Sequence, residues 1–532
     1  MKANPNRFWA IVILLGWVFD FLFWDKPLGI NFAIYTLLCL ATGIVLLRME
    51  GLRLAPGSGL LLIPIAFLAT MTFLRLEPLT VFLTILGTVF LMGVFTLTYL
   101  SGQWTRYTLV DYIFGYLRLF GSMIARPLGF AAENRREQPS LSPSRGGQLW
   151  PVLRGVVIAL PVIAIFASLL SSADPVFASR LEDIIDLFNI QNLPEYIFRL
   201  VYILIFAYIL AGTYLHAARK SDEAVEEKTW IAPFLGSTES SIVLGSVVLL
   251  FIAFVVIQFQ YFFGGQANIT IEGYTFSEYA RKGFGELVAV AFFSLLLLLG
   301  LGAVTRREND TQRRVFSSFG ITLVGLVIVM LISAYQRLAL YEQAYGFSRL
   351  RTYTHVFMIW LALLLVVVVF LELTRRERAA GLAILLAALG FVVSLNVLNV
   401  DAFIVNQNIR REILAANDKT FAEGRADLDA QYFLDLSEDA VPALVTAYQG
   451  AGMPDSVREK VGASLACIRY TRDLDGRELP WQSFHFSRYA ADRALEKINS
   501  NLDTYVIEDD ELPVLVETPG GVEFSCWQYY YD

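Results

Sequence analysis

Ionisable side chains gather in one segment of this chain where the flanking sequence is almost purely apolar. The segment Tyr335–Trp360 joins two apolar runs, Val315–Ala334 and Val356–Leu371. It carries five ionisable residues of a kind that membrane-embedded helices ordinarily exclude: Arg337, Glu342, Arg349, Arg351 and His355. Guanidinium groups suit the binding of a phosphate or carboxylate, and a neighbouring carboxylate can orient them. The segment is therefore the first candidate for a binding site.

Helical spacing arranges these residues as a hairpin. A helix that ends near Gly346 places three residues on one face at intervals of four: Arg337, Tyr341 and Tyr345. Gly346 is suited to a left-handed C-terminal cap, and Ser348 is suited to cap the helix that follows. On that second helix, Arg351 and His355 share a face. The pattern predicts a charged hairpin between two membrane helices.

Other polar residues lie at the ends of apolar segments and are predicted to fall on the same side of the membrane. Charged groups at bilayer depth are costly, so we expect them to pair with one another or to line a wet cavity. The candidate ligand-binding residues are Asp20, Asp174, Arg337, Tyr341, Glu342, Tyr345, Arg349, Arg351, His355, Asn399 and Asp401.

Three interpretations of these residues remain open. In the first, they anchor helix ends, reach the membrane interface and fasten the C-terminal region to the helices. In the second, three arginines, Arg337, Arg349 and Arg351, form an outward-facing pocket for an anionic ligand. In the third, Glu342 and His355 belong with Asp20 to a proton or ion path.

Composition assigns the chain to the membrane proteins. Of its 532 residues, 56% are hydrophobic and only 17% are charged, and the mean hydropathy is +0.55. These values are far too apolar for a soluble domain of this length. Apolar stretches of about 20 residues can span the bilayer, and they predict eleven spans: Phe8–Trp24, Leu28–Leu47, Gly59–Leu74, Pro78–Leu100, Trp150–Leu170, Tyr196–Ala218, Ile242–Phe263, Glu286–Val304, Val315–Tyr335, Thr354–Leu373 and Ala379–Asn399.

The distribution of positive charge predicts the orientation. With the N-terminus in the cytoplasm, twenty Lys and Arg fall in inner segments and seven in outer ones, as the positive-inside rule requires. Eleven crossings then place the C-terminal region outside the cytoplasm. We expect a bacterial inner-membrane protein with this topology.

The chain divides into four predicted regions. Residues 1–100 hold four spans, residues 101–149 an interfacial helix and a cytoplasmic loop, residues 150–400 seven spans, and residues 401–532 an acidic domain. The interfacial helix is Tyr107–Phe130, whose apolar residues recur at helical spacing but are interrupted by charges. The acidic domain carries 24 Asp and Glu against 12 Lys and Arg, which argues against nucleic acid as a partner.

The acidic domain is predicted to be mainly helical. Ser456 and Glu459 have the spacing of a capping box at a helix start. Leu428–Tyr448 and Ser487–Ile498 predict further helices, and Leu512–Tyr530 predicts a short hairpin. Cys467 and Cys526 either form a disulfide, which an extracytoplasmic location permits, or remain two buried thiols.

Motifs for nucleotide, metal and hydrolytic chemistry are absent from the sequence. It contains no Walker-type loop, no G-x-G-x-x-G after a strand and no G-x-S-x-G elbow. Its three histidines, His216, His355 and His485, have no neighbouring His or Cys at ligand spacing. We therefore assign no catalytic residue, metal site or cofactor.

Several short motifs occur along the chain: Asp20–Trp24 with Gly29–Asn31, Ala173–Phe177, Arg337–Glu342, Ala344–Gly346, Leu350–Tyr353, Asn399–Ala402 and Leu436–Leu444. They resemble the bacterial family of multi-pass membrane proteins known as domain of unknown function 4173. Phe347-Ser348 departs mildly from the Leu-Thr expected there. The resemblance implies an integral protein of the bacterial envelope and implies no catalytic residue.

The sequence thus predicts an all-α polytopic membrane protein of about eleven spans with a mainly helical extracytoplasmic domain. We expect a binding, sensing or assembly component of the envelope, and this expectation favours a protein that is not an enzyme. Its expected partners are the lipid bilayer, an anionic lipid or small anionic ligand at the outer face, and another envelope protein. A transporter and an enzyme acting on a lipid-linked phosphate are the alternatives.

Overall fold

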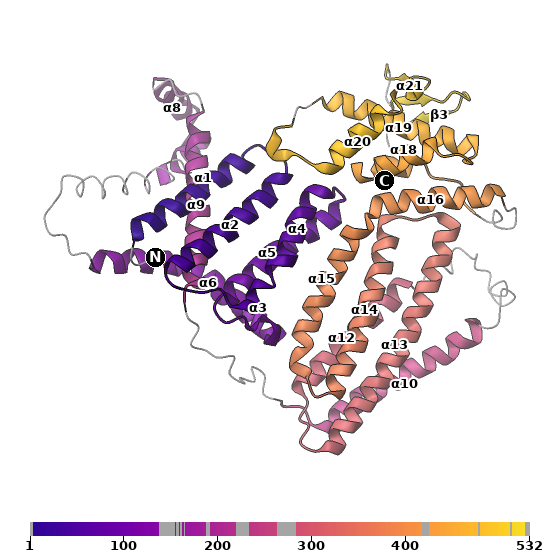
Figure 1. Cartoon of the computed structure of the whole chain (residues 1–532), viewed down its shortest axis with the longest axis horizontal. Coiled ribbons are helices and arrows are strands. Elements are labelled where there is room, and N and C mark those ends of the chain that lie inside the picture. Colours follow the sequence, from indigo (N-terminus) through magenta and orange to yellow (C-terminus); the bar gives the residue numbers. More distant parts are fainter. Residues whose placement is uncertain are drawn as a thin grey trace.

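A computed structural model gives the fold of the chain (Figure 1). It describes residues 4–137, 155, 159, 162–163, 165–187, 192–219, 233–262, 284–417, 425–476, 479–510 and 513–526. Most of the predicted span Trp150–Leu170 lies outside these residues. The helices up to the C-terminal region are α1 Pro5–Phe23, α2 Ile30–Met49, α3 Pro56–Gly59, α4 Leu62–Leu74, α5 Pro78–Thr98, η1 Gln103–Arg106, α6 Leu109–Glu137, α8 Pro175–Leu187, α9 Leu193–Ala217, α10 Ser237–Phe262, α12 Phe284–Val304, α13 Asp310–Tyr345, α14 Arg349–Leu373, η3 Glu377–Ala379 and α15 Ala380–Leu398.

Ten helices within the described residues are long and apolar enough to cross a membrane. They are α1, α2, the combined α3 and α4, α5, α9, α10, α12, α13, α14 and α15. The chain is therefore an all-helical integral membrane protein in this part. Each of these helices overlaps a span predicted from hydropathy, and the eleventh span stays a prediction. α13 continues ten residues beyond the predicted end of its span at Tyr335 and ends at Tyr345, in agreement with the helix end predicted near Gly346.

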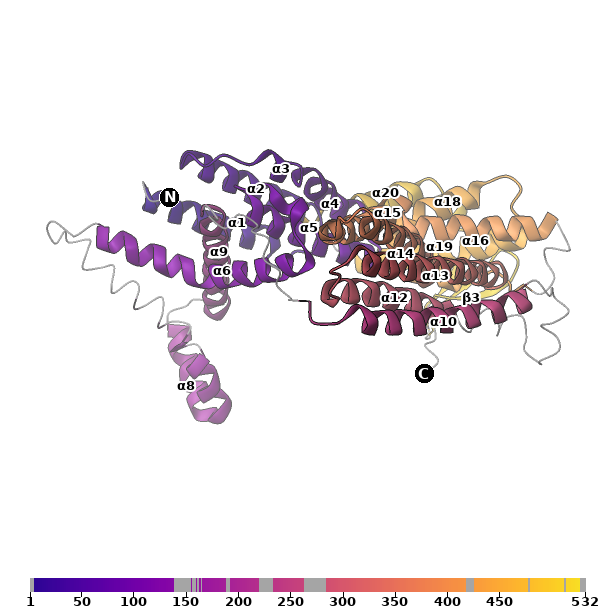
Figure 2. The same cartoon turned by 90° about the horizontal axis from the view of Figure 1, so that it is seen from below.

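The membrane helices pack around two separate apolar cores (Figure 2). The first core lies among α1, α2, α4, α5, α6 and α9, and the second among α10, α12, α13 and α14. Although α9 is distant from α1 in sequence, the two helices pack closely, as do α9 and α6. α15 contacts α14 on one side and α5 on the other, so it joins the two groups.

α6 is the helix predicted to lie in the interface. It is not among the ten helices that could cross a membrane. Tyr112 and Phe130 belong to the first core, and Leu119 is also buried, whereas Ile113, Leu117 and other apolar side chains are exposed. A helix with one apolar face on protein and another exposed is suited to lie along a membrane surface.

The C-terminal region forms a third apolar core above the ends of the membrane helices (Figure 1). It consists of α16 Val400–Asn417, η4 Gln431–Asp435, η5 Glu438–Ala440, α18 Val441–Gln449, α19 Asp455–Asp475, η6 Trp481–Ser483, α20 Phe486–Glu496, α21 Asn499–Leu502, β1 Val506–Glu508, β2 Leu515–Glu517 and β3 Glu523–Ser525. The three strands form an antiparallel sheet in the order β1-β2-β3, with Val516 paired to Ile507 and Phe524. The predicted hairpin is thus part of a small sheet, and a disulfide joins Cys467 of α19 to Cys526 just after β3.

Two local predictions for this region are wrong. The capping box does not form, because α19 begins at Asp455 and its cap position, Pro454, has no hydrogen-bonding side chain. The predicted helix Leu428–Tyr448 is interrupted, because two short 3-10 turns, η4 and η5, precede α18. The interruption places Asp439 where its carboxylate reaches the turn between α4 and α5, and it places Ser437 where its N–H reaches Asp401 of α16.

Candidate functional site

The predicted charged hairpin is present between α13 and α14. Gly346 ends α13 with a φ of +83°, a backbone conformation that favours glycine. A side chain there would also come within 2.8 Å of Asn408 Oδ1 on α16. Asn408 accepts a hydrogen bond from Phe347 N at 2.7 Å and donates to Phe347 O at 3.0 Å. The hairpin turn is therefore held against the C-terminal region.

Arg349 and Asp401 form a close ion pair just beyond this turn. The guanidinium donates two hydrogen bonds, from Nε to Oδ1 at 2.8 Å and from Nη2 to Oδ2 at 2.6 Å. Asp401, near the start of α16, is fully buried. Ser437 N donates to the same Oδ2 at 2.7 Å, and Arg349 N donates to Tyr432 Oη at 2.9 Å. The pair thus joins α14 and α16 to the η4–η5 segment.

Glu77 extends this network to the first group of helices. It caps α5 by accepting from Leu79 N at 2.9 Å and Thr80 N at 2.7 Å. Tyr353 of α14 donates to the Glu77 carboxylate, and Arg349 Nε lies 4.0 Å from it. Glu77 is buried, so these donors replace the water that its charge would otherwise require.

Asp439 is the second buried carboxylate of the C-terminal region that reaches the membrane helices. Its Oδ2 accepts from Leu76 N at 2.7 Å and Glu77 N at 3.2 Å, in the turn between α4 and α5. Its Oδ1 accepts from the Ser487 hydroxyl of α20. Burial raises the pKa of Asp439, and the hydrogen bonds from Ser487 and Leu76 oppose that rise. We call Glu77, Arg349, Tyr353, Asp401 and Asp439 the polar junction.

Glu342 and His355 form a separate pair within the hairpin. Glu342 Oε1 on α13 lies 3.4 Å from His355 Nδ1 on α14. The Tyr335 ring lies 4.3 Å from the imidazole, measured between centroids. Glu342 is buried, and its Oε1 has no hydrogen-bond partner among the residues that the structure describes. A buried carboxylate facing an imidazole is an arrangement that can hold or exchange a proton.

Arg351 closes the hairpin from the other side. It donates to Gly346 O, and its guanidinium carbon lies 4.3 Å from the centre of the Tyr341 ring. The Tyr341 and Tyr345 rings lie 4.9 Å apart. Arg337 is half-buried one turn earlier on α13. Arg351 therefore stabilises the turn through a hydrogen bond to a backbone carbonyl and through a cation–π contact.

Three of the candidate residues have other surroundings. Asp20 on α1 accepts two hydrogen bonds from Arg199 on α9, at 3.0 and 2.6 Å. Asp174 is exposed and caps α8 by accepting from Val176 N at 2.8 Å; Figure 2 shows α8 extending away from both bundles. Asn399 ends α15 with a φ of +51° and turns the chain into α16. The structure therefore brings neither Asp20 nor Asp174 to the hairpin.

A contact between η6, α20 and the first helices completes the attachment of the C-terminal region. Ser483 Oγ donates to Pro27 O at 2.9 Å, and Ile30 N donates to Phe484 O at 3.0 Å. His485 Nε2 lies 3.2 Å from Thr72 O, and its Nδ1 accepts from Ser487 N at 3.3 Å. Burial lowers the pKa of His485 to about 4, so the ring is neutral at pH 7.

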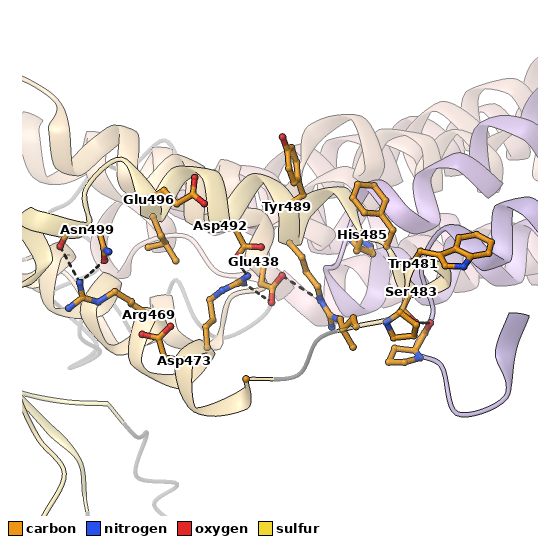
Figure 3. A pocket seen from close by; sticks show the side chains of 18 residues that line it. Glu438, Arg469, Asp473, Trp481, Ser483, His485, Tyr489, Asp492, Glu496 and Asn499 are labelled. Atoms are coloured by element: carbon orange, nitrogen blue, oxygen red, sulfur yellow. Dashed lines mark hydrogen bonds and ion pairs between the residues drawn. The ribbon is translucent and has the colours of Figure 1, made fainter.

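An open pocket of about 780 Å³ lies beside this contact (Figure 3). Its walls come from α19, α20 and η6, with Pro27 of the α1–α2 turn at one end. Seven charged side chains line it: Arg469, Arg472, Arg488, Glu438, Asp473, Asp492 and Glu496. Trp481, Phe484 and Tyr489 contribute aromatic surface. None of these residues is among those predicted to bind a ligand.

The pocket charges are arranged as a network around Glu438. Arg472 lies 2.9 Å from Glu438 and also contacts Asp492, and Arg488 lies 3.6 Å from Glu438. Burial raises the pKa of Glu438, while the two arginines lower it. At the far end, Arg469 donates to Asn499 Oδ1 at 2.8 Å. The pocket thus offers cationic hydrogen-bond donors, from its arginines, and anionic acceptors, from its carboxylates.

Within the described residues, no group of three His, Cys, Asp or Glu side chains is placed to hold a metal ion. The polar junction contains three residues that were not among the predicted site residues: Glu77, Tyr353 and Asp439. Glu77 precedes Pro78 at a predicted helix start, which is the signal of an N-cap. Asp439 has no comparable local signal in a segment rich in acidic residues.

Comparison with known proteins identifies a family and no individual relative. The family model described as Domain of unknown function (DUF4153) matches residues 62–447. This range includes eight of the ten candidate membrane helices, from α4 to α15, and the whole polar junction. Among curated proteins and solved structures, none matches the chain.

Proposed function

The chain belongs to the domain of unknown function 4153 family, and from this premise we propose that it is a ligand-binding component of the bacterial envelope. In this proposal, the C-terminal region is a fixed platform on the membrane helices, and its charged pocket is the binding site. The ligand is a molecule that carries both a negative and a positive group. The narrower relationship to the domain of unknown function 4173 family is part of the same proposal.

The pocket beside η6 is the observation that carries this proposal. Its volume of about 780 Å³ falls in the range of small-molecule sites. Arginines and carboxylates both line its walls, so a purely anionic ligand would meet four carboxylates as well as three arginines. A ligand with both charges can pair with Arg488 and with Asp492 or Glu496 at once. The phosphoethanolamine group, free or as a lipid headgroup, has this chemistry.

The polar junction supports a platform that does not move freely. Asp401 and Asp439 each accept hydrogen bonds across the contact between the C-terminal region and the membrane helices. Both are buried, so separating the two parts would expose unpaired charges and backbone groups. Among the interpretations of the predicted cluster, these contacts favour fastening for Arg349 and Asp401. A site held in this way is organised before its ligand arrives.

Binding can be tested with the full chain in nanodiscs. Two probes carry the proposed chemistry: water-soluble glycerophosphoethanolamine, and dioleoylphosphatidylethanolamine in the bilayer. The control probes are glycerol phosphate, which carries only negative charge, and ethanolamine, which carries only positive charge. We expect calorimetry or thermal shift to detect one of the zwitterions more strongly than either single-charge probe. Arg488→Met should weaken that binding, because Arg488 lines the pocket and is only partly engaged by Glu438 at 3.6 Å.

Lys497→Met is the matched control for this experiment. Lys497 is an exposed cationic residue that directly follows α20, and it is not among the residues that line the pocket. Its substitution should leave binding unchanged. Equal binding by both variants, or no preference for a zwitterion, would contradict the proposed site.

The orientation remains part of the proposal. We place the protein in the inner membrane with a cytoplasmic N-terminus and an extracytoplasmic C-terminal region, on the strength of the positive-inside count. Another envelope protein remains a proposed partner at that face. Reporter fusions at the C-terminus test the orientation: phosphatase activity without fluorescence of a cytoplasmic reporter supports it.

A transporter is the second candidate, and one observation favours it. The Glu342–His355 pair lies between two membrane helices, where ionisable groups are costly and often carry protons. Proton uptake by proteoliposomes that Glu342→Gln abolishes would support this function. The lipid-phosphate enzyme gains no comparable support, since Asp174 caps α8, Glu342 pairs with His355, and neither carboxylate lines the charged pocket.

A further inference from the structure

An exposed aromatic edge runs along η6 and the start of α20. Four large side chains within nine residues are 42–58% exposed: Trp481, Phe484, Phe486 and Tyr489. Single exposed apolar residues are common, but a contiguous group marks an interaction surface. We call these four residues the aromatic edge.

Contacts with α1 and α2 set the depth of this edge relative to the membrane. Phe484 O accepts from Ile30 N, the first residue of the membrane helix α2. The Trp481 ring lies 6.5 Å from the ring of Phe21, in the last turn of α1. The ends of membrane helices lie where hydrocarbon gives way to headgroups. The aromatic edge is therefore at the level of this boundary.

The aromatic edge continues a surface that already faces lipid. On α1, Trp17 and Phe21 are exposed on the outside of the bundle and their rings stack at 5.9 Å. Lys26 extends its ammonium group over the Phe21 ring at 5.2 Å and donates to Phe21 O at 2.6 Å. Exposed Trp and Tyr together with a lysine at a helix end are typical of the membrane–water interface.

We propose that the aromatic edge inserts into the interfacial layer of the bilayer that surrounds α1 and α2. The C-terminal region thus binds the lipid surface directly as well as the membrane helices. Trp481, Phe484 and Tyr489 also line the charged pocket, which places the mouth of the pocket at headgroup level. This last statement rests on the proposed function; the membrane contact itself does not.

Spin labels can measure the depth of the aromatic edge in the full chain. Cys39 is buried and Cys467 is bonded to Cys526, so Trp481→Cys introduces a selectively reactive thiol. In proteoliposomes, we expect a nitroxide at position 481 to be several-fold more accessible to oxygen, relative to a water-soluble nickel complex, than one at Thr504→Cys. Thr504 is exposed and follows α21, a helix that lies on the side of the C-terminal region away from the membrane helices (Figure 1).

Phe486→Cys provides a second position on the aromatic edge, in case the contact of Trp481 with Phe21 is needed for folding. Interfacial depth at both 481 and 486 supports the proposal. Water-like accessibility at both positions, equal to that at 504, overturns it. The result is independent of ligand binding: if Arg488→Met leaves zwitterion binding unchanged while the labels report interfacial depth, the binding site fails and the membrane contact stands.

Discussion

Arg349 and Asp401 are 52 residues apart in sequence and bind each other through two parallel hydrogen bonds of 2.8 and 2.6 Å. The carboxylate is fully buried, whereas the arginine side chain is 22% exposed. Ser437 N donates a third hydrogen bond to the same carboxylate, so donors within the protein satisfy the buried charge of Asp401. The arginine predicted to bind a ligand is thereby committed to an internal partner.

The first prediction concerns the loss of this pair. Arg349→Met should destabilise the protein by about 3 kcal/mol, because it leaves a buried carboxylate without its countercharge. The double substitution Arg349→Met with Asp401→Leu should be less damaging than the sum of the single ones. Thermal unfolding in detergent measures both effects.

An exposed ion pair gives the control for this prediction. Arg375 and Asp310 lie 2.7 Å apart, but their side chains are 65% and 70% exposed. Arg375→Met should change the stability by less than about 1 kcal/mol. Similar losses for Arg349→Met and Arg375→Met would show that the Asp401 pair is not a structural contact.

A second prediction concerns Asp439. Asp439→Ala removes the acceptor for Leu76 N, Glu77 N and Ser487 Oγ, and each buried donor left unpaired costs about 1–3 kcal/mol. Asp439→Asn keeps one oxygen and should lose less. We expect limited proteolysis of membranes to cleave the C-terminal region faster in the Ala variant than in the Asn variant. Equal cleavage of both variants and wild type would mean that Asp439 does not hold this contact.

Hydropathy predicted the membrane helices because each must cover the hydrocarbon core, whatever it packs against. The first span was expected at Phe8–Trp24 and is Pro5–Phe23. The turn at Gly346 was likewise predictable, since its positive φ is a local property of glycine. Helix existence, helix ends and the position of the charged hairpin follow from short segments of sequence.

The partners of buried polar groups could not be predicted in this way, because they depend on how distant segments meet. Asp20 pairs with Arg199, 179 positions away, and Asp439 binds Leu76 N, 363 positions away. The pocket combines residues of the C-terminal region with Pro27. Short stretches of sequence contain no signal that identifies such distant partners. Charge in a membrane segment indicates that a partner exists and leaves its identity open.

A third prediction uses the disulfide to test the orientation. Cys467 and Cys526 are bonded in the structure, and disulfides persist outside the cytoplasm. If cells are treated with N-ethylmaleimide, and the protein is then reduced and treated with a maleimide polymer, two thiols should become labelled. Labelling without the reduction step, or its absence after reduction, would place these thiols in a reducing compartment. Cys467→Ser should also lower the stability by about 2–4 kcal/mol.

The last prediction concerns pH. His485 is buried with its pKa lowered from 6.5 to about 4, by burial first and by Arg488 among smaller causes. The unfolded chain therefore binds the proton first as pH falls, so stability is full above pH 6.5 and declines between pH 6.5 and 4. At pH 5 the loss is about 2 kcal/mol.

His485→Gln should be less stable at pH 7.5, where the hydrogen bonds to Thr72 O and Ser487 N are altered, yet should lose less on acidification. Thermal unfolding of both proteins from pH 7.5 to 5 measures the two slopes, and carboxylates elsewhere contribute equally to each. Parallel slopes would mean that the pKa of His485 is not lowered in the folded protein.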